Sequence, residues 1–592
     1  MRILIVAALA ALSYAGPLRA EQILGPGRID NSNRVILPGG PTLGKWQGGK
    51  YQATPDALTL PQTADPSSGG DVSPFSVKPD GATIARALRA RFNDTIQAVD
   101  YGVVCNGTTD IGSAMQTLFN SLTTGGPSRI NMPTGKCLWN TETTLTKAVI
   151  LDGQGSSQLG DGQGTLLVQT NTAITPITIT GAGGLQTANG IVFSNIGVQQ
   201  VQAAPAVGWT PTNYPPFFSL AGAPQVTFRN VFGFGVDKLI SADGSGRLST
   251  FDLRAQCFTY CVKTNRSYDA DRHENSHFFP FWSLVTGTTT AAQNAVIDYQ
   301  NANSDGFVLG RSDTPFYDRV FILGMRDGIR LVAGLNKPGI NTPGSASKVA
   351  IGSISCDQVA KCIHIVDATG VTIQFGMITA QGAASSNSVA IPGSAAIQID
   401  SGGQAIIQGG VLQSEFADGK IINLMNASAG SRIQLTSLFA RLITGGTGQS
   451  VLYAVNSLSP HELSLSNPPI LAPSTAALPI VNAGSNAVVK VPFLNYQFVA
   501  GTLASFQGAT FVAQSSLPNL VLSPTSAGTI TNMNVTLPSA ANDGQEASLM
   551  STQPVSSVRI TSGYPIVGNV KQLTANVTVR FRLMGGAWVR VQ

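Results

Sequence analysis

Apolar residues recur at a fixed spacing in the middle of the chain. The segments Gly328-Ile329-Arg330-Leu331, Cys362-Ile363-His364-Ile365 and Ala396-Ile397-Gln398-Ile399 share one small–apolar–polar–apolar pattern, and each begins 34 residues after the one before. The second and third are followed by another strand pattern with a glycine-rich end, at 371–377 and 405–412. Fixed-period self-similarity with two or three short strands per unit is typical of a solenoid. We see no helical periods between them, so the pattern predicts an all-β parallel β-helix over residues 145–460.

Two helical patterns precede this region. Apolar residues at 84, 88 and 92 predict a short helix over 82–92. A second apolar stripe predicts a helix that Thr109 or Asp110 can cap. The members of that second stripe are Ile111, Met115, Leu118, Phe119 and Leu122.

The region from Gly81 to Gly155 carries a series of motifs in a set order. They are Gly81-Ala82-Thr83, Leu88-Arg89-Ala90-Arg91-Phe92, Val99-Asp100-Tyr101-Gly102-Val103, Asn106-Gly107-Thr108-Thr109-Asp110, Met132-Pro133-Thr134-Gly135 and Leu151-Asp152-Gly153-Gln154-Gly155. This series resembles the N-terminal cap of phage tailspikes and pectate-lyase-like β-helix proteins, although Ile111 replaces a second acidic residue of the family pattern. The resemblance implies a right-handed, single-stranded parallel β-helix whose N-terminal helical cap spans residues 81–144.

The two ends of the chain differ from the repeat. Residues 1–20 have the pattern of a signal peptide, with Arg2, an apolar run over 3–12 and small residues before position 21. The apolar run is too short to span a bilayer, so we expect a secreted or periplasmic protein without membrane insertion of the mature chain. Residues 21–80 predict an extended Pro/Gly-rich leader. Residues 461–592 predict a linker and a small C-terminal β-domain, similar in order to tailspike modules that support homotrimers.

Composition narrows the class of partner. Only 11% of the residues are charged and the net charge is +5, whereas ordinary domains have roughly 25% charged residues. There is no dense basic block, so nucleic acid is not an expected partner. A surface poor in charge and rich in amides fits a polysaccharide.

The six cysteines form three pairs of neighbours in the sequence. Six cysteines allow 15 connectivities, so the pairing Cys105–Cys137, Cys257–Cys261 and Cys356–Cys362 is a hypothesis. An oxidising compartment favours it. The spacing and the scarcity of nearby histidines do not fit a metal site.

Charged and aromatic residues gather between 265 and 330, where eight of the 31 acidic residues lie. Carbohydrate chemistry needs carboxylates for acid–base work, flat rings for sugar faces and arginines for acidic groups; the alternative is one coil with a longer loop and ordinary surface charge. The candidate catalytic residues are Asp269, Asp271, Glu274 and Asp305. The candidate substrate-binding residues are Tyr268, Arg272, His273, His277, Trp282 and Arg311, although Trp282 fits a buried core equally well.

Strand geometry predicts the separations between the candidate carboxylates. Asp269 and Asp271 are an i, i+2 pair, and Asp305 lies one 34-residue repeat beyond Asp271. Carboxylates on neighbouring coils, about 4.8 Å apart, suit retaining glycosidases, and a wider separation suits inverting ones. Asp305-Gly306 and Asp327-Gly328 also fit simple turns before strands.

The segment from His273 to His277 matches the H-E-x-x-H pattern of zinc proteases. Its neighbours predict a strand, in which His273 and His277 share one face and Glu274 points to the other. That arrangement does not bind zinc, so no metal is expected here. His364 alternates with Ile363 and Ile365, which predicts that it points outward.

Three functions remain open. A glycoside hydrolase acting on a surface or extracellular glycan comes first. A polysaccharide lyase comes second, with Arg272, Arg311, Arg319 or Arg326 as the base and calcium as a cofactor; no cofactor is expected otherwise. The third is a non-catalytic β-helix that binds or organises polysaccharide.

Overall fold

The structure is a computed structural model that describes six short strands before residue 95 and most of residues 95–592. Its gaps after residue 95 are 123–127, 157–162, 182–189, 224, 335–345, 347, 383–393, 401–402, 417–419, 425–430, 443–449, 455–460, 467–469, 472–486, 492–493, 502, 514–518, 525–527, 540 and 542. The chain divides into two compact units, residues 1–96 and 97–592. The expected signal peptide lies outside the described residues.

The first unit contains two small antiparallel sheets. Strands β1 (Arg28–Ile29), β2 (Arg34–Ile36), β3 (Thr42–Gln47) and β4 (Lys50–Ala53) form one of them. Strand β5 (Ser76–Val77) pairs with β6 (Arg86–Ala87). The helix expected over 82–92 is therefore wrong at Arg86–Ala87, where pairing with another strand overrides the local pattern; the rest of that segment lies outside the described residues.

The second unit begins with a short cap. It contains the last residue of β7 (Thr95–Gln97), the 3₁₀ helix η3 (Ala98–Tyr101), β8 (Asn106–Asp110) and α3 (Gly112–Ser121). The predicted apolar stripe is buried in α3, where Met115 and Leu118 have no exposed surface. Asp110 supports the first turn by accepting a hydrogen bond from the Gly112 N–H at 3.0 Å.

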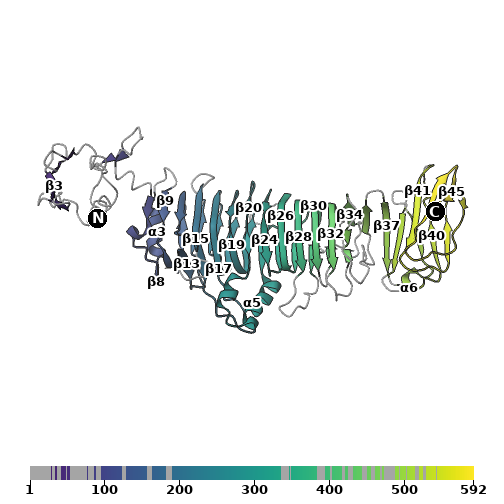
Figure 1. Ribbon diagram of the computed structural model, residues 1–592, viewed down its shortest axis with the longest axis horizontal. Coiled ribbons are helices and arrows are strands. Elements are labelled where there is room, and N and C mark those ends of the chain that lie inside the picture. Colours follow the sequence, from purple (N-terminus) through teal and green to yellow (C-terminus); the bar gives the residue numbers. More distant parts are fainter. Residues whose placement is uncertain are drawn as a thin grey trace. The chain divides into compact units, whose positions relative to one another are not determined.

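Successive coils of parallel strands follow, and each coil contributes strands to three stacks (Figure 1). Stack 1 contains β9 (Ser128–Asn131), β12 (Val149–Asp152), the first parts of β15 (Ile191–Gln200) and β17 (Val226–Asp243), β18 (Ser249–Phe251), β20 (Arg272–Glu274), β23 (Phe316–Asp318), the first halves of β26 (Lys348–Val359), β28 (Val371–Gly382), β30 (Ala405–Phe416) and β32 (Arg432–Leu442), and then β34 (His461–Leu465) and β36 (Ala487–Val491).

The other two stacks complete each coil. Stack 2 contains β10 (Gly135–Leu138), β13 (Thr165–Gln169), later parts of β15 and β17, the start of β19 (Arg254–Asn265), β21 (His277–Phe278), β24 (Val320–Leu323), the second halves of β26 to β32, and β35 (Ile470–Leu471). Stack 3 contains β11 (Thr143–Leu145), β14 (Ile177–Thr180), β16 (Phe218–Ala221), the ends of β17 and β19, β22 (Asp305–Leu309), β25 (Asp327–Leu331), β27 (Lys361–Ile365), β29 (Ala395–Ile399), β31 (Lys420–Leu424) and β33 (Ser450–Ala454).

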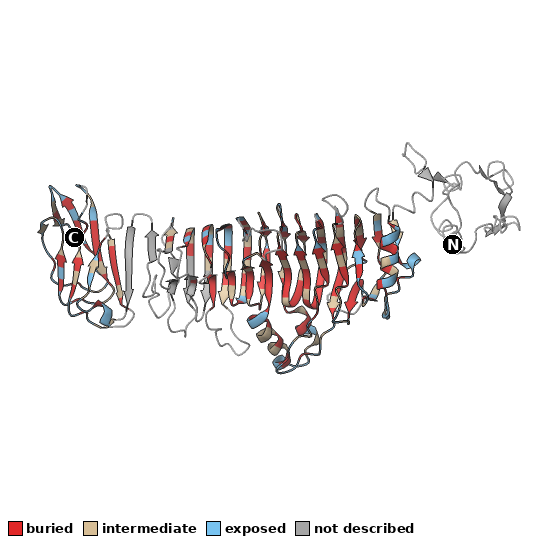
Figure 2. Ribbon diagram, turned by 180° about the vertical axis from the view of Figure 1, so that it is seen from behind, coloured by how far each residue is buried: buried red, intermediate tan, exposed pale blue. Residues whose placement is uncertain are grey.

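The register of stack 3 explains the sequence repeat. Ile329 pairs with Ile363, and Ile363 pairs with Ile397, so the 34-residue spacing is one coil of the solenoid. These isoleucines are buried. Figure 2 shows that buried residues predominate in the described strands of the stacked coils. The repeated apolar position is thus the inward column of one stack.

Two helices interrupt the coils between β21 and β22. They are α4 (Phe281–Thr286) and α5 (Thr290–Asn303), which project from one edge of the stacks (Figure 1). The expectation of uninterrupted strands over 145–460 is wrong here. Thr289 caps α5 by accepting a hydrogen bond from the Ala292 N–H, and the insert packs Trp282 and Val296 against Trp209 and Phe258 of the coils.

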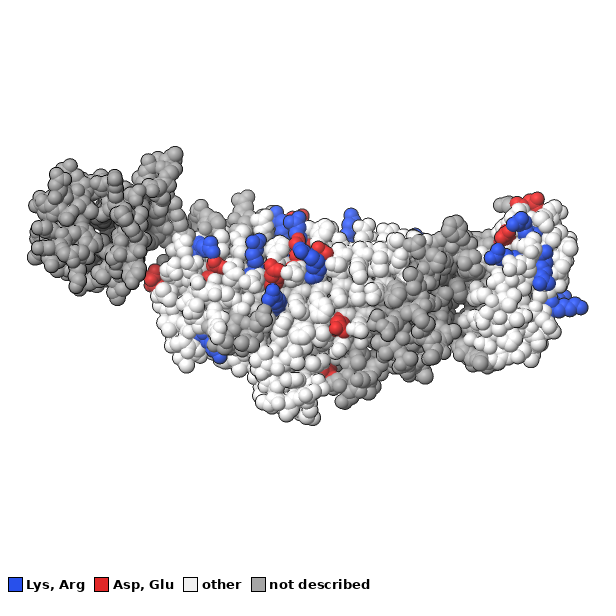
Figure 3. All heavy atoms as spheres, viewed as in Figure 1, with Lys and Arg blue, Asp and Glu red and all other residues white. Residues whose placement is uncertain are grey.

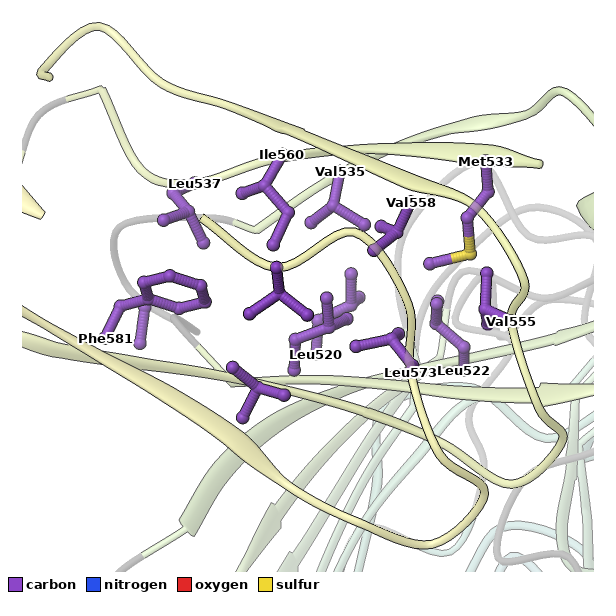
Figure 4. Packing of buried hydrophobic residues seen from close by; sticks show 14 of the residues in the cluster. Leu520, Leu522, Met533, Val535, Leu537, Val555, Val558, Ile560, Leu573 and Phe581 are labelled. Carbon is purple, nitrogen blue, oxygen red and sulfur yellow. The ribbon is translucent and has the colours of Figure 1, made fainter. Parts of the chain in front are cut away.

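The C-terminal part has its own core. Strands β37 (Leu494–Gly501), β39 (Asn519–Pro524) and β41 (Glu546–Ser551) pair in parallel, and β41 pairs with β44 (Val579–Met584) in antiparallel fashion. A second sheet joins β38 (Thr510–Val512), β40 (Met533–Thr536) and β42 (Val558–Thr561), with α6 (Leu503–Phe506), β43 (Ile566–Val567) and β45 (Ala587–Arg590) beside them. Apolar side chains from these strands, Val535, Ile560 and Phe581 among them, fill the space between (Figure 4).

Candidate functional site

An open groove of about 690 Å³ runs across the outer face of stack 1. It crosses six consecutive coils, from β20 to β32, in the direction in which the strands stack. Its lining residues are Arg272, Glu274, Phe316, Tyr317, Asp318, Ala350, Ile351, Gly352, Gln374, Phe375, Gly376, Gln408, Gly409, Gly410 and Thr436.

The alternation of the strands places these residues. Arg272 pairs with Phe316, and the same outward column continues coil by coil through Ala350, Gln374 and Gln408. Side chains two residues apart on a strand share a face, so a second outward column runs beside the first. The groove follows these two columns, and the residues of both columns line it.

Glycines form much of the second outward column. A Cβ at Gly352 would lie 2.3 Å from Asp318 Oδ1, one at Gly376 would lie 2.6 Å from the Gly352 carbonyl oxygen, and one at Gly410 would lie 2.2 Å from the Gly376 carbonyl oxygen. Tight stacking of the coils therefore requires glycine here. The absence of side chains at these positions leaves the trough open.

Arg272, Glu274 and Asp318 line the charged end of the groove, and Arg319 lies beside the two carboxylates. Glu274 pairs with Asp318 in register on neighbouring strands. Arg319 contacts both, with Nη2 3.5 Å from Glu274 Oε2 and Nε 3.4 Å from Asp318 Oδ2. The side chains of Glu274 and Asp318 are 40% and 48% exposed, so both carboxylates can reach a ligand. Figure 3 shows basic and acidic side chains close together on the coils around β20.

The corner after each strand fixes these carboxylates. Asn275 and Arg319 follow them in the left-handed conformation, with φ of 53° and 51°, and end the two strands at the same height. Ser353 on the next coil donates a hydrogen bond to Asp318 Oδ1 at 3.2 Å. The Asp318 carboxylate is thus held on one oxygen by Ser353 and on the other by Arg319.

Beneath the charged end, polar side chains point into the coil. Asp271 has no exposed surface and accepts hydrogen bonds on Oδ1 from the Leu248 N–H at 2.9 Å and from Ser267 Oγ at 2.8 Å. Burial raises the pKa of Asp271 to about 7, which these hydrogen bonds only partly offset. His273 is buried against Tyr317, with its Nδ1 2.9 Å from Thr250 Oγ1, and burial lowers the pKa of His273 to about 3.

The structure does not bring the four candidate catalytic carboxylates together. Asp269 adopts a φ of 66° and its exposed side chain lies 3.6 Å from Arg247, while Asp271 points inward. They do not form the expected i, i+2 pair, because Asp269 lies in a left-handed loop before β20. Asp305 is not one coil from Asp271 either: the helical insert lengthens this coil, and Asp305 pairs with Tyr260 in stack 3.

The candidate substrate-binding residues also separate. Arg272 lines the groove. Tyr268 is exposed outside it, with the Arg311 guanidinium 5.6 Å from its ring centre. Trp282 is only 3% exposed in the core between the insert and the coils, so it is no platform for a sugar.

The zinc alternative is excluded by the same corner that positions Glu274. Strand β20 ends at Glu274, and β21 begins at His277 after the left-handed Asn275. His273 therefore points inward, whereas His277 lies half-buried among Phe279, Phe281 and Phe321. The expectation that both histidines share one face is wrong. In the described part of the chain, no group of three or more His, Cys, Asp or Glu side chains is placed to hold a metal ion.

A second cluster of charge lies in stack 3. The Arg326 guanidinium donates to both oxygens of Asp305 at 2.9 and 2.6 Å, and Arg330 donates to Asp327 at 2.7 Å. Asp305 and Asp327 pair in register inside strands, so the interpretation of Asp305-Gly306 and Asp327-Gly328 as turns is wrong. We call Asp305, Arg326, Asp327, Arg330, His364 and Asp400 the buried ion cluster.

His364 is the centre of the buried ion cluster rather than an outward-pointing residue. Its Nδ1 lies 2.8 Å from Asp327 and its Nε2 lies 2.9 Å from Asp400. Burial alone lowers the pKa of His364, but the two carboxylates outweigh burial and raise the pKa above its usual value. Burial also raises the pKa of Asp305 to about 6, despite the opposing effect of Arg326. His364 is only 4% exposed, so this cluster faces protein more than solvent.

Sequence reasoning missed several groove residues. Asp318 is one of the eight acidic residues between 265 and 330 but is not among the predicted catalytic residues. Its pairing with Glu274 cannot be predicted from the sequence unless the helical insert between them is recognised. The sequence does mark Gln374 and Gln408 as equivalent, since they occupy the same position in the repeated segments that begin at 371 and 405.

The three disulfides are Cys105–Cys137, Cys257–Cys261 and Cys356–Cys362. Among the described helices, none is long and apolar enough to cross a membrane.

The fold and groove define an all-β protein of stacked parallel strands with an open surface site. No family model matches the chain, and no curated protein matches it in sequence.

The chain is similar to several solved structures. One is a tailspike protein mutant of E. coli bacteriophage HK620 in complex with a pentasaccharide (TM-score 0.40, 11% identity, covering 84% of this chain and 83% of that one). Another is the N-terminal fragment of gene product 12 of bacteriophage Phi29 (TM-score 0.39, 12% identity, covering 80% of this chain and 89% of that one). A third is the catalytic unit of the thermostable alpha-1,3-glucanase from Streptomyces thermodiastaticus (TM-score 0.34, 13% identity, covering 71% of this chain and 69% of that one).

Proposed function

We propose that this protein is a polysaccharide-active enzyme, a glycoside hydrolase that cleaves a surface or extracellular glycan with retention of configuration. The observation that carries the proposal is the pair Glu274 and Asp318, in register on neighbouring strands at one end of an open groove. Neighbouring strands lie about 4.8 Å apart, and carboxylates roughly 5 Å apart are the arrangement of retaining glycosidases.

The contacts of the two carboxylates favour different roles. Asp318 is held by Ser353 and Arg319, which stabilise a fixed, ionised carboxylate suited to attack the anomeric carbon. Glu274 contacts Arg319 at 3.5 Å and is freer to exchange a proton with the glycosidic oxygen. In this scheme Glu274 gives its proton to the leaving oxygen as Asp318 forms a glycosyl ester. Glu274 then takes a proton from the water that releases the sugar.

Arg319 argues against the lyase alternative at this end of the groove. A guanidinium stays protonated in proteins and is a poor base, which applies to Arg319 and equally to Arg272 in the groove lining. Its suitable role is to hold the two carboxylates and to balance their charge. Phe316, which is 42% exposed beside them, offers a flat apolar face to a sugar ring.

The wider organisation belongs to the same proposal. The stacked strands, which run from β9 to β36, form a right-handed β-helix between the cap and the C-terminal β-domain. That C-terminal domain supports a homotrimer. Residues 1–20 direct export. The three disulfides fit an oxidising compartment.

The test is to incubate the purified protein with a panel of bacterial and plant polysaccharides and to measure new reducing ends and unsaturated-uronate absorbance. We expect reducing ends without the absorbance, and their loss in Glu274→Gln. The matched control is Asp269→Asn, which removes an exposed carboxylate outside the groove. Unsaturated products would identify a lyase instead. Binding without either signal would leave a non-catalytic polysaccharide-binding protein.

A further inference from the structure

The groove has two chemically different ends. All charged residues of its lining, Arg272, Glu274 and Asp318, come from β20 and β23. From β26 to β32 the lining consists of glycines, apolar side chains, amides and Thr436. We call the strip formed by Gln374, Gln408 and Gln434 with the adjacent glycines the amide end.

The amide side chains are aligned along the direction of the stack. Gln374 pairs in register with Gln408, and Gln408 pairs with Gln434. Gln408 Nε2 donates to Gln434 Oε1 at 3.1 Å, so the amides follow one another coil by coil. Gln374 and Gln408 are exposed, and each amide has donors and an acceptor for further hydrogen bonds.

This spacing matches an extended sugar chain. Successive strands lie about 4.8 Å apart, and an extended chain of pyranose rings advances by a similar length per residue. A linear glycan lying along the groove would therefore meet the same set of groups once per coil. The glycines beside the amides leave room for the rings, because no side chain rises from Gly376 or Gly410.

We propose that the amide end binds uncharged sugar residues of a linear glycan, one per coil, next to the bond that is cleaved at the charged end. The inference rests on the proposed function only for the position of that bond. Amides exchange hydrogen bonds with hydroxyl and N-acetyl groups, which are neutral. A row of uronates would place carboxylates here without a cationic partner, and that desolvation is costly.

The nearest cation along β32 does not change this conclusion. Arg432 lies two residues before Gln434, but its guanidinium is 3.6 Å from the Glu462 carboxylate. Both line a separate hollow of about 380 Å³. The acidic partner offsets the charge of Arg432, so the surface beside the amide end does not select anionic sugars.

The experiment measures binding by titration calorimetry with size-graded fragments of cellulose, mannan and chitin, which are neutral, and of pectate and alginate, which are acidic. The protein is the full chain as wild type, Glu274→Gln and the double variant Gln374→Ala/Gln408→Ala. Asn303→Ala, which removes an exposed amide on α5, is the matched control, and circular dichroism checks the fold of each. We expect affinity for one neutral series to rise with fragment length. It should fall roughly tenfold in the double variant and stay unchanged in the Asn303→Ala control, and Glu274→Gln allows the same titrations without cleavage of the fragments.

The inference would be overturned by an acidic series bound more tightly than every neutral one, or by a neutral series bound equally by wild type and the double variant. Lack of binding by every neutral series would also overturn it. Failure of the proposed function has a different signature. In that case neutral fragments bind in an amide-dependent way, and no glycan is cleaved by the wild type.

Discussion

Among the described strands, carboxylates lie in register on neighbouring strands in two places, and the two places differ in what surrounds them. In stack 1, Glu274 and Asp318 point out into a groove and share one arginine. In stack 3, Asp305 and Asp327 are buried, and each has an arginine within 3 Å. The same backbone pairing thus supplies an accessible pair of carboxylates in one stack and a buried ion network in the other.

The difference lies in how far each carboxylate is exposed to solvent. The side chains of Asp305 and Asp327 are 5% and 0% exposed. They are paired with Arg326, Arg330 and His364, although Asp327 Oδ1 has no hydrogen-bond partner, so burial keeps them from a ligand. The groove pair retains exposed oxygens beside an open trough. Strongly shifted pKa values are often used to find active sites, yet here they mark the interior. Exposure and shape are the better guides in this molecule.

The largest expected effect tests the reactive pair. Asp318→Asn should lower kcat by about 10²–10⁴-fold, because the amide cannot serve as a nucleophile or ionised partner. Reducing-end kinetics measure it. The thermal unfolding midpoint should stay close to that of wild type, since the side chain is half exposed. Full activity in this variant would remove Asp318 from the site.

The buried ion cluster should respond in the opposite way. Asp327→Asn leaves His364 and Arg330 without their shared partner, and breaking a buried pair costs about 3–5 kcal/mol. Denaturant unfolding followed by circular dichroism should show this loss, with kcat unchanged at a temperature where the variant is folded. In Asp269→Asn, which removes an exposed pair, the loss should be at most about 1 kcal/mol. Equal losses in the two variants would contradict the comparison.

The pH dependence of stability tests the buried Asp271, which lies beneath the charged end of the groove. The pKa of Asp271 is raised to about 7 from its ordinary 3.8, so folding favours its protonated form. The stability that it contributes is present below about pH 4 and is lost as the pH rises through 7. In Asp271→Asn this loss should disappear, which flattens the pH dependence of stability by a few kcal/mol, at most about 4. Melting temperatures from pH 4 to 8 measure it, and parallel curves for the two proteins would refute the assignment.

The smallest expected effect concerns the aromatic face. Phe316→Ala should raise KM by roughly fivefold, about 1 kcal/mol of lost packing against a sugar ring, and leave kcat nearly unchanged. Tyr268→Ala, which truncates an exposed ring outside the groove, is its control. An equal change in both variants would show that Phe316 has no special part in binding.

The repeating part of the fold could be predicted because inward positions repeat locally. Ile329, Ile363 and Ile397 fall one coil apart, and the apolar stripe of α3 lies within one helix. The insert of α4 and α5 was hidden, since Trp282 fitted a sugar platform as well as a core. It also displaced the one-coil relation expected between Asp271 and Asp305.

The site was only partly predictable, because side-chain direction depends on the corners. Glu274 and Arg272 were chosen from charge and do line the groove. Asp271 and His273 were chosen from the same cluster of charged and aromatic residues, with a continuous strand assumed through this segment, yet both are buried. The left-handed residues Asp269 and Asn275 reset the alternation of side chains, and short sequence patterns did not reveal such a reset at a non-glycine residue.

The crosslinks have a consequence for the order in which this chain can acquire its structure. The disulfides join cysteines separated by 32, 4 and 6 residues, so none waits for a distant segment to be synthesised. In a solenoid each coil needs only its neighbour. A ribosome that delivers this chain from its N-terminus therefore supplies each coil, and both cysteines of each disulfide, before the more distant parts of the chain are made.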